Sequence, residues 1–170
     1  IVAKFKGEGN LSKIKLTVGQ FMPIMIGFSL LFIILTHTAL PPLLKTLNTP
    51  QEIYSDAVMY ITYIMYGMIA MMFFMGFQSF TTGFGDTITP MAIQICTVLL
   101  NMVLDPLLIF GIGGFPKLGL QVAAIATLIS RVIATMLAVI IFSRKYKEYI
   151  PTIQDMIPNR QAIRNIFKIS

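Results

Sequence analysis

The chain has 170 residues, of which 56% are hydrophobic and 12% are charged, and its formal net charge is +6. A soluble domain carries about 25% charged residues, so this chain lacks the polar surface that a water-soluble globule needs, and lipid must cover the remainder. The positive charge does not indicate a nucleic-acid partner, because the basic residues gather beside the ends of long apolar segments, where membrane orientation places them.

The first part of the chain contains a basic segment and the first apolar stretch. Residues 1–15 are short and basic, and we expect them to be cytoplasmic. Residues 16–40 carry no charged side chain, and Pro41 and Pro42 follow them. A helix needs about 20 apolar residues to cross the hydrocarbon core, so this stretch is predicted to be the first transmembrane helix and to end at the two prolines.

Three further apolar stretches follow, at about 53–81, 90–111 and 118–143. The second begins after Thr49-Pro50-Gln51-Glu52, a pattern typical of a helix start, and the third after Thr89-Pro90. The sequence therefore predicts an all-α integral membrane protein with four transmembrane helices within residues 16–143.

The basic residues predict the orientation of these helices. With four spans both ends of the chain lie on one side, and Lys45 and Lys117 lie on the other. This imbalance predicts cytoplasmic ends and a cytoplasmic segment at 144–170 of a multi-pass protein in the cell membrane. The ten basic residues on the side of the ends are Lys4, Lys6, Lys13, Lys15, Arg144, Lys145, Lys147, Arg160, Arg164 and Lys168.

A carboxylate and an amide stand inside the third predicted span. Asp105 in hydrocarbon costs about 2.5–3.5 kcal/mol, and Asn101 lies four residues earlier, on the same helix face. Pro106 removes a backbone donor and frees the carbonyl of Met102. Such oxygens suit a hard cation such as Na⁺, whereas a proton needs only the carboxylate. The alternative is an Asn–Asp pair that only holds helices together.

Other polar side chains lie at a similar predicted depth. At about 1.5 Å rise per residue, Asp105 is about 9 Å and Asn101 about 15 Å from the outer helix ends, with Thr127 at about 13 Å and Tyr60 at about 6 Å. Spacing alone does not show that the four side chains meet. Arg131 lies near the middle of the fourth span, where it could pair with another part of the protein, reach the inner headgroups or line a water path.

Several ordered motifs give a family resemblance. They are Gly85-Asp86-Thr-Ile-Thr-Pro90, Asn101-x-x-x-Asp105-Pro-Leu-Leu-Ile-Phe-Gly111, Phe115-Pro-x-Leu-Gly119 and Ala123-Ala-x-Ala-Thr127-x-Ile-Ser130. In this order and spacing they resemble the multidrug and toxic compound extrusion (MATE) family, although Val122 stands where the family usually has glycine.

The resemblance implies a fold and an activity. Family members have twelve transmembrane helices in two lobes, so this chain would hold helices three to six of the first lobe and the start of the inter-lobe linker, 144–170. Its partners would be the lipid bilayer, the remaining helices of the full-length protein and a small amphipathic or cationic substrate. Export would be driven by Na⁺ or H⁺, and no further cofactor is expected.

The resemblance also implies site residues. The family's first-lobe cation site maps onto Asp105 and Asn101, which would ligate Na⁺ in a sodium-coupled member, with Tyr60 from the preceding helix and Thr127 from the following one. The departure at Val122 weakens the assignment of Thr127.

Two rival functions remain open. One is a flippase for lipid-linked saccharides from the same superfamily, which would need more cationic residues than Arg131 within the spans. The other is a membrane subunit that does not transport. An enzyme is not expected, because the sequence shows no nucleophile–base pair, no metal-ligand cluster and no phosphate loop.

Overall fold

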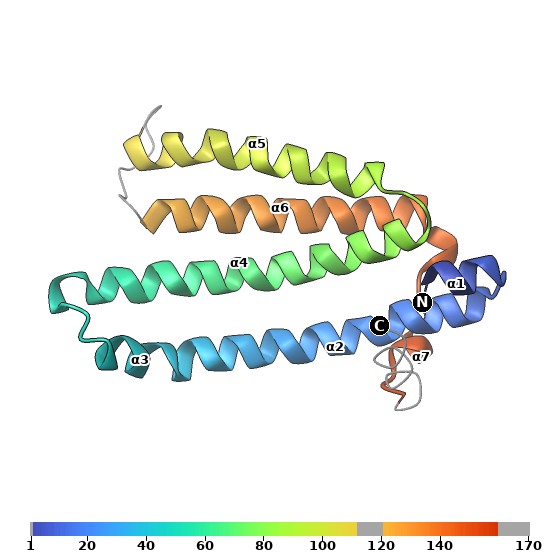
Figure 1. Cartoon of the computed structure of the whole chain (residues 1–170), viewed down its shortest axis with the longest axis horizontal. Helices are drawn as coiled ribbons and strands as arrows, with labels where there is room; N and C mark the ends of the chain where they lie inside the picture. Colours follow the sequence, from blue (N-terminus) through green and yellow to red (C-terminus); the bar gives the residue numbers. More distant parts are fainter. Residues whose placement is uncertain (1, 112–120, 160–170) are drawn as a thin grey trace.

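The computed structural model describes residues 2–111 and 121–159, and the elements in this part of the chain are helices (Figure 1). In chain order they are α1 (Val2–Gly7), α2 (Leu11–Thr38), α3 (Leu40–Thr46), α4 (Gln51–Gly83), α5 (Ile88–Phe110), α6 (Gln121–Lys145), the 3-10 turn η2 (Lys147–Tyr149) and α7 (Ile153–Met156).

Four of these helices, α2, α4, α5 and α6, are long and apolar enough to cross a membrane. They run side by side in the order α5, α6, α4, α2 (Figure 1). Few of their residues are buried within the chain, and large apolar side chains such as Ile34, Met102 and Met136 are more than half exposed. An exposed apolar surface of this kind suits lipid contact, and the predicted all-α membrane fold class is confirmed.

The first helices differ from the predicted boundaries. Residues 2–7 form the short helix α1 within the predicted basic segment, and α2 begins at Leu11 instead of 16. Asn10 explains the early start, because its side chain accepts a hydrogen bond from the Lys13 amide at 3.1 Å and caps the helix. After α2, Pro41 and Pro42 lie in the first turn of α3, where a helix tolerates proline.

The start of α5 also differs from the prediction. Thr89 is not its cap, because the helix begins at Ile88. Asp86 supplies the capping oxygens: it accepts hydrogen bonds from the Thr89 amide at 3.0 Å and from the Thr89 hydroxyl at 2.6 Å. The predicted start of the fourth span at 118 lies outside the described residues, and the division of the chain at residue 144 stays a prediction.

Helix α6 packs between α4 and α5 through small residues. On α4, Gly67 allows the close approach, because a Cβ there would lie 3.4 Å from the Arg131 side chain and 3.7 Å from the Leu128 Cα. The Thr135 hydroxyl donates to the Ala70 carbonyl at 2.8 Å across the same contact. Small side chains let membrane helices pack this closely. The buried residues of α6 include Val122, Ala124, Ala126, Ser130, Ala134 and Ala138.

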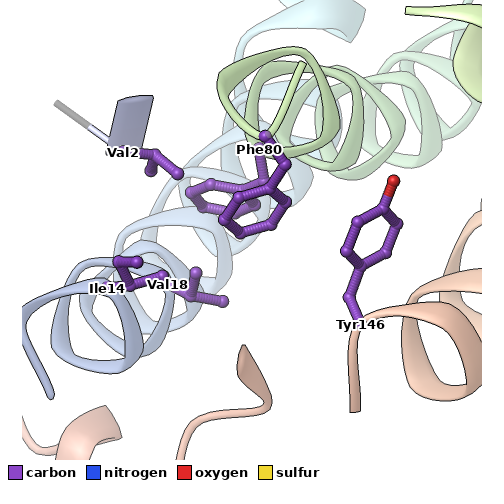
Figure 2. Packing of buried hydrophobic residues seen from close by; sticks show 6 residues of the cluster. Val2, Ile14, Val18, Phe80 and Tyr146 are labelled. Carbon is purple, nitrogen blue, oxygen red and sulfur yellow. The ribbon is translucent and has the colours of Figure 1, made fainter. Parts of the chain in front are cut away.

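A hydrophobic cluster joins the helices at the α4–α5 end of the bundle. Figure 2 shows its members from α1, α2 and α4 and Tyr146, which directly follows α6. The Phe84 ring stacks on Tyr146 and Tyr149, with centroid distances of 5.2 and 4.4 Å. The cluster fixes the residues after α6 against the first helices. Its buried members are Val2, Ile14, Val18, Phe80, Phe84 and Tyr146.

Asp86 connects this end of the bundle through polar contacts. Its Oδ2 accepts hydrogen bonds from Lys145 at 2.6 Å, from the Tyr146 hydroxyl at 2.5 Å and from the Thr89 hydroxyl, whereas the Thr89 backbone N–H donates to Oδ1. These bonds hold the pKa of Asp86 well below its usual range, and the bond from Lys145 contributes most to this lowering. Burial and the contact with Asp86 raise the pKa of Tyr146, so the phenol stays protonated and donates.

Replacing Asp86 by Ala should therefore destabilise the α4–α5 end by about 1–2 kcal/mol, because it removes a helix cap and leaves a buried phenol unpaired. The depressed pKa means that the Asp86 contribution is present above the ordinary value of 3.8 and is lost as the pH falls toward the lowered pKa. Thermal unfolding of the full-length protein should show a constant deficit for the variant from pH 8 to about 4.5, shrinking only below about pH 4.

Asp56→Ala serves as the control, because Asp56 is an exposed acid on α4. An equal deficit in this control, or no deficit for Asp86→Ala, would contradict the assignment.

Candidate cation site and adjoining cavity

Helices α5 and α6 bring three of the four predicted site residues together. The Asn101 amide, oriented so that its donors meet acceptors, donates to Asp105 Oδ2 at 3.2 Å and accepts from the backbone N–H of Thr127 at 3.3 Å. The same amide lies 3.5 Å from the Thr127 hydroxyl, which donates to the Ala123 carbonyl at 2.8 Å. Asn101 therefore links the carboxylate on α5 to α6.

Asp105 has an oxygen that this network does not use. Its Oδ1 is buried and has no hydrogen-bond partner among residues 2–111 and 121–159. The ion pairs in the described part of the chain are Lys13–Glu8 and Lys145–Asp86, so no described cation neutralises Asp105. Because an unpaired carboxylate oxygen is costly in a low-dielectric setting, this atom is suited to bind a cation or a proton.

Tyr60 lies on α4 and is half-buried. Within the described residues, no hydrogen bond connects its hydroxyl to Asp105, Asn101 or Thr127. The structure thus joins the α5 and α6 members of the predicted site by hydrogen bonds, and no such bond among the described residues joins Tyr60 to them.

A cavity of about 210 Å³ adjoins this site between α4, α5 and α6. Asn101 and Thr127 belong to its lining, whereas Asp105, one turn away along α5, does not. Polar and apolar side chains share the wall, so the cavity is amphipathic. The full lining is Met71, Phe74, Gln94, Thr97, Val98, Asn101, Thr127, Ser130, Arg131 and Ala134.

Gln94 and Thr97 line the cavity although the sequence did not predict them as site residues. A signal for them exists: Gln94, Thr97 and Asn101 are spaced by three and four residues, as are Thr127, Ser130, Arg131 and Ala134 on α6. Each set marks one helix face. That the two faces point at each other depends on tertiary packing.

Comparisons with known proteins relate the chain to membrane transporters. The MatE family model matches residues 1–107. A probable multidrug resistance protein NorM from Thermotoga maritima is 38% identical, covering 85% of this chain and 31% of that protein. An FAD transporter from Shewanella oneidensis is 54% identical over 54 residues, 32% of this chain and 12% of its own length.

One solved structure matches the fold. It is a MOP superfamily transporter from Pyrococcus furiosus, with a TM-score of 0.78 and 24% identity, and the match covers 99% of this chain and 36% of that one. The chain spans about a third of the length of the curated relatives that match most of it.

Proposed function

This chain belongs to the MatE family, and on that premise we propose that the full-length protein is a cation-coupled exporter of amphipathic compounds. The observation that carries the proposal is the buried Oδ1 of Asp105, which lies beside Asn101 and Thr127 and has no partner among residues 2–111 and 121–159. A carboxylate in a membrane span marks an ion or proton pathway by default. Family membership also points to a transporter rather than an enzyme.

In the proposed cycle, the coupling cation binds Asp105 from outside the cell. Neutralising the carboxylate lowers the cost of burying it, and α5 bends near Pro106, where the helix lacks one backbone hydrogen bond. The bend reshapes the cavity next to Asn101 and releases the substrate outward, after which the two lobes rock back.

The basic residues support the direction of this cycle. Lys4, Lys6, Lys13, Arg144 and Lys147 lie in or beside the helix ends near the α4–α5 turn. By the positive-inside bias, this end of the bundle is cytoplasmic in the cell membrane, and the α5–α6 end, closer to Asp105, faces outward.

Na⁺ and H⁺ place different demands on Asn101. A proton needs only Asp105 Oδ1, and the amide can keep its present bonds. A hard cation prefers oxygen ligands. To ligate Na⁺ beside Asp105, the Asn101 side-chain amide must rotate so that its oxygen faces the carboxylate. This rotation breaks the hydrogen bond that the oxygen accepts from the Thr127 backbone N–H. Asn101→Leu should therefore reduce Na⁺-driven transport by about tenfold or more, and it should spare most H⁺-driven transport.

The test uses the full-length protein in liposomes loaded either with the cationic dye ethidium or with the anionic dye carboxyfluorescein, with an imposed gradient of Na⁺ or of H⁺. One gradient should accelerate movement of the dye. A loss of this movement in Asn101→Leu would then indicate Na⁺ bound by Asp105 and Asn101, and its persistence would indicate a proton on Asp105. Dye movement that responds to neither gradient would refute the proposal and would favour a non-transporting subunit. Translocation of a lipid-linked saccharide without dye transport would favour the flippase.

The relatives are named for multidrug resistance and for FAD transport. Neither name fixes the charge of a compound that this protein would carry. The proposal therefore commits to amphipathic compounds, and the charge that the cavity prefers has to come from its own side chains.

A further inference from the structure

Arg131 occupies an unusual position in the middle of α6. A Cβ built on Gly67 would lie 3.4 Å from both Cδ and Nη1 of Arg131, so the Arg131 side chain packs against the α4 backbone at Gly67. Four residues further along α6, the Thr135 hydroxyl bonds the Ala70 carbonyl and holds the two helices at this spacing. The charged group is thus fixed inside the bundle and also lines the cavity.

This guanidinium has unused bonding capacity. Nη1 of Arg131 is buried and has no hydrogen-bond partner in the described part of the chain. The two ion pairs among residues 2–111 and 121–159, Lys13–Glu8 and Lys145–Asp86, do not involve it. Arginine stays charged in proteins and offers five N–H donors in a planar fork, so a guanidinium on a half-buried residue, with its Nη1 buried and without a partner in the described residues, calls for an acceptor with negative charge.

The neighbouring side chains provide further donors. Ser130 is 1% exposed, lines the same cavity, and its hydroxyl has no partner among the described residues. Gln94 and Thr97 add neutral polar groups from α5, and among residues 2–111 and 121–159 no carboxylate belongs to the lining. One positive charge, two buried groups without partners and no acid make a cavity that is complementary to an oxyanion.

We propose that this cavity binds the carboxylate or phosphate group of an amphipathic compound, with Arg131 supplying the charge and Ser130 a second donor. Met71, Phe74 and Val98 contact its apolar part. The geometry suits a planar oxyanion, because a guanidinium binds carboxylate and phosphate with paired N–H donors. The inference rests on the proposed transport function and names the chemical class of its substrate.

The test compares two flavins that share a ring and a ribityl chain and differ by one phosphate. Purified full-length protein in a non-ionic detergent is titrated with flavin mononucleotide and with riboflavin, and binding is read from flavin fluorescence. The wild type should prefer the phosphate form by about tenfold or more, as a charge-assisted hydrogen bond allows. Arg131→Gln should bring the two affinities close together, and Arg131→Lys should keep part of the preference.

Arg144→Gln is the matched control, because it removes the same charge from an exposed position on the same helix. It should leave the preference unchanged. Thermal unfolding should show that Arg131→Gln is at least as stable as the wild type, since a buried charge without an ion-pair partner is removed. An equal affinity of the wild type for both flavins would overturn the inference.

The inference would also be overturned if Arg131→Gln lowered the thermal midpoint and weakened both flavins equally. That result would mean that Arg131 pairs with a carboxylate from outside this chain. Nanodiscs with and without phosphatidate distinguish two sources of the oxyanion: competition with flavin mononucleotide identifies a lipid headgroup, and its absence identifies a soluble compound.

The flavin titration measures binding without an ion gradient, and the liposome assay measures gradient-driven transport of a cationic or an anionic dye by the wild type. Failure of the inference and failure of the proposed function therefore appear in different experiments.

Discussion

Replacing Asp105 by Asn in the full-length protein should reduce ion-driven efflux on the order of 100-fold or more, since losing one partner of a buried charge interaction costs about 3–5 kcal/mol. The amide nearly matches the carboxylate in shape but cannot exchange a proton or carry the charge that attracts a cation. The measurement is efflux, from proteoliposomes, of the dye that the wild type transports, under the gradient that drives the wild type.

The same variant should fold normally. Asn at position 105 removes a carboxylate whose Oδ1 has no partner among the described residues, so the cost of burying a charge disappears. The thermal midpoint should stay equal to that of the wild type or rise. A low efflux with a raised midpoint separates a functional role of Asp105 from a structural one, in which the midpoint would fall.

Asp56→Asn is the control for this experiment. Asp56 is an exposed acid on α4, outside the candidate site, and its replacement makes the same chemical change. Efflux by this variant should match the wild type. Unchanged coupled efflux by Asp105→Asn would exclude Asp105 as the coupling acid and leave the Asn101–Asp105 contact as a device that holds helices together.

The second large effect concerns Gln20, a fully buried amide on α2. Its Nε2 donates to the backbone carbonyls of Asp155 and Ile157 at 2.8 and 2.6 Å, and its Oε1 accepts from the backbone N–H of Asn159 at 2.8 Å. At the adjacent Gly19, a Cβ would lie 2.5 Å from the Asp155 carbonyl oxygen. One side chain therefore holds the segment after α6 directly on α2.

Gln20→Leu should release this segment. The change leaves buried backbone groups without partners, and each costs about 1–3 kcal/mol. We expect faster hydrogen–deuterium exchange in peptides covering 150–159 of the full-length protein, with little change in α5. If the segment stayed protected, other contacts would have to hold it.

Gln154→Leu makes the same substitution at an exposed position of the segment. It should leave the exchange of 150–159 unchanged. Equal release in both variants would show that any leucine introduced in this region disturbs the contact.

The spanning helices and the position of Asp105 within one of them were predictable from the sequence. Long charge-free stretches predicted four spanning helices, because hydrocarbon admits few charges and needs a fixed helix length. The same constraint singled out Asp105, since a carboxylate there needs a specific reason. Asn101 followed from helical spacing, and the family resemblance added Thr127 and Tyr60 as site residues, whose roles stay predictions.

Local polar chemistry decided the details that the apolar pattern did not contain. Asn10 starts α2 five residues earlier than predicted, and Asp86 caps α5 in place of Thr89. Several polar residues near a helix start can serve as its cap, and the hydrophobic periodicity of the helix does not indicate which of them does. Helix α1 has only six residues, which is too short for a periodic pattern to stand out.

Only the tertiary structure decided which polar groups meet. The contact between Gln20 and the segment at 155–159 joins residues about 135 positions apart, and nothing local in the sequence encodes it. Likewise, Asn101 meets Thr127 and Arg131 lies over Gly67 because small residues let α4, α5 and α6 pack closely. The sequence by itself determined that this chain lies in lipid, since that depends on composition along single helices, whereas the cavity with Arg131 and Ser130 depends on how three helix faces are turned toward one another.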